Sequence, residues 1–224
     1  MNQSIGAISR PAAYLSLVAA GAFVLLLALL HLLEPEFDPS WNFISEYTLG
    51  AYGWLMALAF GSLAVSFSAC FLAIKSQLRT VVGRIGLAML LISATSMVLA
   101  ALFKTDPITT PPDAVTTSGA LHNLGGSLGL AMPFAGLLVC WGLTHNPAWR
   151  AALRSLWWVT GIALASTVTF IVALVLLIPS DGMLGPDVHV GWFGRVEIVA
   201  YSVWLMVVAW QALQRSTIEN GGVA

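Results

Sequence analysis

Side chains capable of acid–base or nucleophilic chemistry gather in three polar stretches of an otherwise apolar sequence. Ser45 and Glu46 lie in the first stretch, Asp106 and His122 in the second, and Arg195 in the third. A histidine can act as a general base, a nearby carboxylate can orient it, and a serine hydroxyl can act as a nucleophile. Ser45, Asp106 and His122 are therefore candidate catalytic residues. Glu46 and Arg195 are candidate ligand-binding residues.

Each of these side chains also has a purely structural interpretation. Glu46 precedes an apolar run and can cap the helix that begins there. His122 can simply form a hydrogen bond within the first turns of its helix. Arg195 keeps its charge, so at a membrane edge it should pair with a carboxylate. The plausible partners are Asp106, Glu46 and Glu197.

The composition indicates that water is not the main solvent of this chain. Of 224 residues, 58% are hydrophobic and 8% are charged, whereas soluble domains carry about 25% charged residues. The formal net charge of -1 and the absence of a basic tract argue against a nucleic-acid partner. Membrane lipids are the expected partners, and the composition identifies no protein partner.

Six apolar segments have about the 20 residues that a helix needs to cross a bilayer. The sixth segment contains Arg195 and Glu197 near its start, so these two residues are expected at the interface. The sequence therefore predicts an all-α integral membrane bundle, with residues 1–224 forming a single transmembrane domain. The expected spans are residues 12–33, 50–74, 85–103, 121–143, 156–178 and 192–213.

The distribution of basic residues predicts the orientation of the bundle. Seven of the nine lysines and arginines fall on one side of the spans, and Lys104 and Arg195 fall on the other. Because cytoplasmic loops are enriched in Lys and Arg, both termini are expected in the cytoplasm. The three polar stretches then lie outside, at the outer face of the cytoplasmic membrane.

Small and helix-breaking residues in the fourth span predict how it packs. Gly125 and Gly129 form a GxxxG pair, which favours close contact within the bundle more than a dimer face. Pro133 should kink the same helix. The middle of the membrane contains no ionisable side chain, which argues against a proton-coupled transporter.

Three histidines are expected on the outer side, but their spacing does not predict a metal site. His31, His122 and His189 are widely separated, and the sequence contains neither HxxxH nor HExxH. Haem would need two ligands at matched depth, and no clear second ligand is present. We therefore assign no metal ligands, and the identity of any cofactor stays open.

Four segments carry a family resemblance: SEYTLGAYGWLM at 45–56, FKTDP at 103–107, SGALH at 118–122 and GRVEIVAYSVW at 194–204. Together they resemble the DUF998 family of bacterial and archaeal membrane proteins over nearly the whole chain. Compared with the shorter SELG form, this sequence has two extra residues, Tyr47 and Thr48. The resemblance implies a six-helix fold and implies that the five candidate residues belong together. It names no activity.

These observations favour a membrane protein that binds a lipid or other amphiphile, or assists a membrane complex, through its outer polar cluster. A first alternative is an intramembrane hydrolase or transferase acting on a lipid at the outer leaflet, with Ser45, His122 and Asp106 as its catalytic residues. A second alternative is a small-molecule transporter. Whether the protein is an enzyme is not decided by the sequence.

Overall fold

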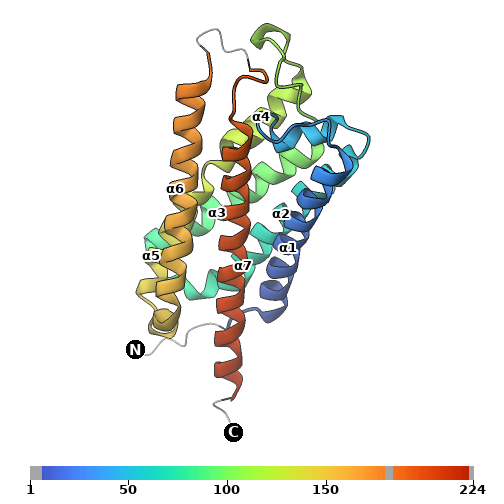
Figure 1. Ribbon diagram of the computed structural model, residues 1–224. Helices are drawn as coiled ribbons and strands as arrows, with labels where there is room; N and C mark the ends of the chain where they lie inside the picture. The colour runs from blue at the N-terminus through green and yellow to red at the C-terminus, as the bar shows by residue number, and fades with distance from the viewer. Residues whose placement is uncertain (1–6, 180–183, 222–224) are drawn as a thin grey trace.

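The chain folds into long helices joined by loops and short 3₁₀ segments, as the computed structural model in Figure 1 shows. The structure describes residues 7–179 and 184–221. Within these ranges, six helical rods are long and apolar enough to cross a membrane, so the predicted all-α, six-span class is confirmed. The helices are α1 (Arg10–Leu33), α2 (Gly53–Ile74), α3 (Val81–Leu102), α4 (Thr117–Gly129), α5 (Met132–Thr144), α6 (Leu153–Leu177) and α7 (Gly191–Gly221).

The fourth candidate membrane span consists of two helices, α4 and α5, with a break between Gly129 and Met132. Pro133 lies in the first turn of α5, where its missing N–H interrupts the hydrogen-bond ladder, so the expected kink is present. The GxxxG pair packs within the bundle, as predicted. Ser96 of α3 donates a hydrogen bond of 2.7 Å to the Gly125 carbonyl, and a Cβ at Gly125 would lie 3.0 Å from the Ser96 carbonyl oxygen.

The two ends of the bundle differ in the length of their connections. The long-loop end carries residues 34–52, which include η1 (Ile44–Leu49), residues 103–116, which include η3 (Pro112–Ala114), and residues 184–190, which precede α7. The terminal end carries η2 (Lys75–Gln77), η4 (Pro147–Ala152), the start of α1 and the end of α7. In Figure 1 the long-loop end is at the top and the terminal end is at the bottom.

The helices form a ring that is closed near one end and open near the other. α1 packs against α2 and α7, α2 against α3, α3 against α4 and α5, and α6 against α7 and α5. α5 also contacts α7, whereas α4 makes no extensive contact with either α6 or α7. The ring is therefore closed by α5 near the terminal end. Near the long-loop end it is open between α4 and α6.

Tight packing fills the closed half of the ring. Trp204 of α7 is fully buried, and its indole N–H donates a hydrogen bond of 2.9 Å to Thr160 of α6. Gly136 of α5 permits the close approach, because a Cβ there would lie 3.1 Å from the indole nitrogen. This contact joins α5, α6 and α7 below the opening.

Candidate functional site

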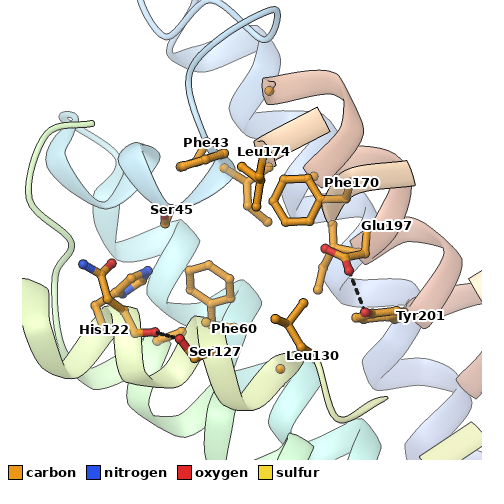
Figure 2. Close-up of a pocket in the computed structure, with 18 of the residues that line it drawn as sticks. Phe43, Ser45, Phe60, His122, Ser127, Leu130, Phe170, Leu174, Glu197 and Tyr201 are labelled. Atoms are coloured by element: carbon orange, nitrogen blue, oxygen red, sulfur yellow. Dashed lines mark hydrogen bonds between the residues drawn. The ribbon is translucent and has the colours of Figure 1, made fainter. Parts of the chain in front are cut away.

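A cavity of about 420 Å³ occupies the open half of the ring. α4, α6 and α7 form its walls, η1 covers it at the long-loop end, and Phe60 of α2 and Met97 of α3 lie on its inner side. The walls are largely apolar. The polar side chains that reach the cavity are Ser45, His122, Asn123, Ser127, Glu197 and Tyr201, and Figure 2 labels all of these except Asn123.

α4 presents a small and partly polar face to this cavity. The lining residues are three or four positions apart, which places them on one side of the helix: Asn123, Gly126, Ser127 and Leu130. A helix face that meets only lipid is normally apolar, so this composition is typical of a face that meets something else. A Cβ at Gly126 would have no heavy atom within 4 Å. The backbone at this position therefore borders open space.

His122 enters the cavity from α4 with a defined tautomer. Its Nδ1 lies 2.8 Å from the carbonyl oxygen of Phe103, and its ring meets Phe60 edge-on at 6.0 Å between centroids. A carbonyl oxygen only accepts, so Nδ1 carries the proton and Nε2 of the neutral ring carries a lone pair. Nε2 bonds to none of the described residues. His122 therefore offers the cavity a hydrogen-bond acceptor.

Ser45 lines the same cavity from η1, so the structure brings two of the predicted catalytic residues together (Figure 2). The Ser45 carbonyl accepts a hydrogen bond of 2.7 Å from the Thr48 hydroxyl, which fixes the local turn. The Ser45 hydroxyl makes no hydrogen bond within the described part of the chain. In particular, it is not bonded to His122.

Asp106 does not orient His122, so the predicted pairing of these two residues is wrong. The Asp106 carboxylate accepts hydrogen bonds of 2.8 Å from both the backbone N–H and the hydroxyl of Thr116. Gly119 leaves room for it, because a Cβ there would collide with the carboxylate. His122 instead uses the carbonyl of Phe103, which lies just past the end of α3 and has no helical partner. Asp106 closes the second loop.

Glu46 joins two loops of the long-loop end. Its side chain is buried, and Oε2 accepts hydrogen bonds from the Asn42 side chain at 2.8 Å and the Phe43 backbone at 3.1 Å. Oε1 accepts a hydrogen bond of 2.8 Å from the backbone of Ile108 in the second loop. Through these three hydrogen bonds, Glu46 connects the first and second loops beside the cavity.

Arg195 holds the first loop against the start of α7. The residue is only 4% exposed, and Nη1 donates to the carbonyls of Asn42 at 2.6 Å, Gly191 at 3.1 Å and Pro39 at 3.2 Å. Nε donates to Nε2 of His31 at 2.9 Å. Among the described residues, no carboxylate is a partner of Arg195, so the predicted ion pair with Asp106, Glu46 or Glu197 is wrong.

The reason for this difference lies in the first loop, which wraps around the guanidinium with backbone carbonyls. The candidate carboxylates have other donors. Tyr47 completes the arrangement: it is fully buried, its hydroxyl lies 3.4 Å from Nη2, and its ring centre lies 5.8 Å from Cζ of Arg195. Tyr47 is one of the two residues that distinguish this sequence from the SELG form. The extra length therefore supplies part of the arginine site.

His31 contributes to the arginine site as a neutral acceptor. Its Nδ1 lies 2.7 Å from the Leu27 carbonyl in the preceding turn of α1, so this nitrogen carries the proton. Nε2 is then free to accept from Arg195. The spacing of the sequence gives no sign of this contact, because His31 and Arg195 are separated by most of the chain.

Electrostatic effects in the exposed part of the first loop are modest. The backbone N–H of Ser40 donates to Asp38 Oδ1 at 2.8 Å, and this hydrogen bond, helped by that of the Ser40 side chain and by the nearby charges of His189 and Arg195, lowers the pKa of Asp38. Asp38 is therefore ionised at neutral pH. It lies near Arg195 without pairing with it.

Sequence reasoning missed a second polar group in the cavity, formed by Glu197, Tyr201 and Thr167. The Tyr201 hydroxyl donates to Oε1 of Glu197 at 2.7 Å and lies 2.7 Å from the Thr167 hydroxyl. Glu197 and Tyr201 are four residues apart on α7, so this pair could have been found from helical spacing. Thr167 belongs to α6, and no local pattern connects it to them.

Glu34 was missed as well, and it explains a glycine in the resemblance motif. The Glu34 carboxylate is buried, accepts from the backbone N–H of Tyr52 at the start of α2, and lies against Gly50. A Cβ at Gly50 would collide with the carboxylate. The positively polarised helix start favours a carboxylate at this position.

The three histidines considered for metal binding lie in different surroundings. His31 contacts Arg195, His122 lines the cavity, and His189 is exposed. Within residues 7–179 and 184–221, no group of three or more His, Cys, Asp or Glu side chains could hold a metal ion. Cys70 and Cys140 are buried as free thiols in the helix packing.

Comparison with known proteins identifies the family. No curated protein and no solved structure matches the chain. The family described as Protein of unknown function (DUF998) matches residues 17–211. This range includes every residue of the cavity and of the arginine site, so the chain belongs to the DUF998 family.

Proposed function

We propose that this protein binds an amphiphile in the cavity between α4, α6 and α7, with its apolar chain along the walls and its polar end beneath η1. The observation that carries the proposal is the unfilled half of the helix ring. Its walls are mostly apolar, and a few polar side chains of η1, α4 and α7 line it. Ligand sites commonly combine these two features. The gap between α4 and α6 provides a lateral route from the surrounding lipid.

Two features favour binding over hydrolysis as the function of this cavity. Ser45 and His122 both line it, but no hydrogen bond joins them, and no carboxylate orients the histidine. A nucleophile normally needs an adjacent base within hydrogen-bonding reach. If the protein were a hydrolase of this kind, Ser45→Ala would abolish turnover without affecting binding.

The closed half of the ring argues against transport. The buried contact of Trp204 with Thr160 and Gly136 lies between the cavity and the terminal end. An alternating-access carrier needs a site that can open to both sides. The packing of α5 against α6 and α7 supports a site that opens toward one half of the membrane.

A glycine in the cavity wall permits a direct test of binding. Gly126→Leu adds a side chain into the open space at Gly126, and Gly161→Leu is a matched control, because Gly161 also has open space but is exposed on α6 away from the cavity. Native mass spectrometry of the proteins purified in mild detergent should detect bound lipid on the wild type and on Gly161→Leu. Binding to Gly126→Leu should be at least tenfold weaker. Equal binding to all three proteins would contradict the proposal, as would a wild type that carries no lipid even after lipid addition.

We also propose that the long-loop end faces outward across the cytoplasmic membrane, with both termini inside. The proposal rests on the arginine and lysine distribution. Cysteines introduced at the exposed positions Asp113 and Arg150 would lie at opposite ends. Because the native cysteines are buried, a membrane-impermeant maleimide should label Asp113→Cys in intact bacterial cells and Arg150→Cys only after lysis. The reverse pattern would overturn the orientation.

A further inference from the structure

The polar groups of the cavity are mainly hydrogen-bond acceptors, which restricts the head group that fits. Glu197 lines one wall, with Oε1 bonded to Tyr201 and Oε2 bonded to none of the described residues. His122 lines the facing wall with an unprotonated Nε2 (Figure 2). The Ser45 hydroxyl can accept as well as donate. A ligand that supplies donors would satisfy all three groups.

No cationic side chain balances Glu197 in this cavity. Among the described residues that line it, none is a lysine or an arginine. Arg195 lies only two residues from Glu197, but its donors point to the first loop and to His31. A carboxylate at membrane depth is normally paired with a positive charge or with several donors. The partners of Glu197 are the hydroxyl groups of Tyr201 and Thr167, so within the described part of the chain it has no counter-ion.

Hydrogen bonds from two hydroxyl groups hold the Glu197 side chain at the cavity wall. The Tyr201 hydroxyl donates to the carboxylate and lies 2.7 Å from the Thr167 hydroxyl, which is also within 3.1 Å of the Ala163 carbonyl oxygen. A cation placed at Oε2 would favour the ionised form of Glu197, and hydrogen bonds to an ionised acceptor are stronger than neutral ones. Thr167 and Tyr201 therefore hold the carboxylate in place, with its second oxygen left for a ligand.

We infer that the cavity takes an amphiphile with a primary ammonium head group, with Glu197 as its counter-ion. This inference rests on the proposed function and specifies the ligand class of that site. The ammonium group would donate to Oε2 of Glu197, while His122 and Ser45 accept other donors of the head group. An anionic head group would meet an uncompensated carboxylate. Both a single-chain amine and a phospholipid with an amino head group carry the required chemistry.

Matched twelve-carbon probes test the head-group preference. Dodecylammonium, dodecanol and dodecanoate are added to the purified protein in dodecyl maltoside at equal mole fractions, and thermal unfolding is followed. At about ten times its dissociation constant, dodecylammonium should raise the melting temperature by about 3–6 °C. Dodecanol should raise it less, and dodecanoate should not raise it. Equal shifts with all three probes would overturn the inference.

Variants connect this preference to Glu197. Glu197→Gln should lose the dodecylammonium shift, whereas Glu36→Gln, the same change at an exposed carboxylate of the first loop, should keep it. Tyr201→Phe preserves the carboxylate and should weaken binding several-fold, which provides a second test if Glu197→Gln fails to fold. A full shift in both cavity variants would overturn the inference.

Two further arms separate the possible outcomes. If Gly126→Leu abolishes the shifts of all three probes and the wild type shows no preference among them, amphiphile binding stands and the ammonium inference fails. If Gly126→Leu binds every probe normally, the proposed function itself fails. Phosphatidylethanolamine and phosphatidylglycerol of equal chain length, compared by native mass spectrometry, distinguish a phospholipid from a single-chain amine. Stronger binding of phosphatidylglycerol would contradict the inference.

Discussion

α7 carries a buried arginine near each end, and a comparison of the two shows which parts of the molecule hold it together and which part is left open. Arg195 donates to carbonyls of the first loop, and Arg215 donates to the Ala148 carbonyl of η4 at 2.9 Å. Each guanidinium also lies over an aromatic ring, with Arg195 5.8 Å from Tyr47 and Arg215 4.8 Å from Trp149. Neither has a carboxylate partner in the described part of the chain.

The two ends differ in what surrounds these buried arginines. At the terminal end, Trp149 and Gln77 are buried and share a hydrogen bond of 3.3 Å, Asn146 bonds to Gln77 as well, and the cavity beside them is smaller, at about 210 Å³. At the long-loop end, the equivalent space between α4 and α6 is a cavity. Buried arginines therefore do not mark the proposed ligand site. The site lies where a helix contact is missing.

The largest predicted effect is the loss of Arg195. Arg195→Ala leaves the carbonyls of Pro39, Asn42 and Gly191 without their donor, and we expect a loss of about 3–5 kcal/mol in unfolding free energy. Thermal unfolding in detergent measures this. Arg154→Ala, at an exposed position, should change the unfolding free energy by less than about 0.5 kcal/mol. Unfolding of Arg195→Ala at the wild-type temperature would contradict the claim that Arg195 stabilises the first loop against α7.

The second prediction separates stability from binding. Arg215→Ala removes the donor to Ala148 and the contact with Trp149, and should cost about 2–4 kcal/mol. Because Arg215 is at the terminal end, the folded fraction should bind amphiphile with unchanged affinity. If binding to the folded fraction weakened as much as stability did, the two ends would not be independent.

A smaller effect is expected for Asp106, which closes a loop. Asp106→Asn keeps the size of the side chain but weakens its two bonds to Thr116, and should cost about 1–2 kcal/mol. Amphiphile binding in the folded protein should stay within about twofold of wild type, because Asp106 does not contact His122. Selective loss of binding, with stability unchanged, would restore Asp106 as a partner of the histidine.

The smallest predicted effects distinguish two adjacent glycines of α4. Gly125→Ala places a methyl group 3.0 Å from the Ser96 carbonyl oxygen, so the unfolding free energy should fall by about 1–2 kcal/mol. Gly126→Ala enters open space and should be neutral or stabilise by up to about 1 kcal/mol through helix propensity. Parallel melting curves report both values. Equal destabilisation would mean that the Gly126 side of α4 is packed.

The sequence was sufficient for the features that depend on local composition. Apolar length predicted the six spans, and Pro133 predicted the break in the fourth. Polar helix ends gathered on one side led to the expectation that Ser45 and His122 share a site, and both line the cavity. These predictions succeed because a bilayer requires long apolar helices and confines polar groups to their ends.

Loop geometry was not predictable in the same way. The carboxylate expected beside His122 bonds to Thr116, and backbone carbonyls replace the carboxylates expected beside Arg195. A sequence shows which side chains are charged but not which backbone carbonyls lack a hydrogen-bond partner. Contacts between oppositely charged side chains were therefore the expected ones. Glu197 was assigned to an ion pair for the same reason. The missing contact between α4 and α6 is a property of tertiary packing.

Photocrosslinking with the membrane's own lipids tests the central claim most directly. Host cells are grown with a diazirine-bearing fatty acid, irradiated, and the purified protein is mapped by peptide mass spectrometry. Our account predicts that crosslinks concentrate on the cavity faces of α4 and α6, near Leu130, Phe170 and Leu174, and that Gly126→Leu removes them while Gly161→Leu does not. Crosslinks spread evenly over the lipid-facing helices, and unchanged in Gly126→Leu, would contradict it.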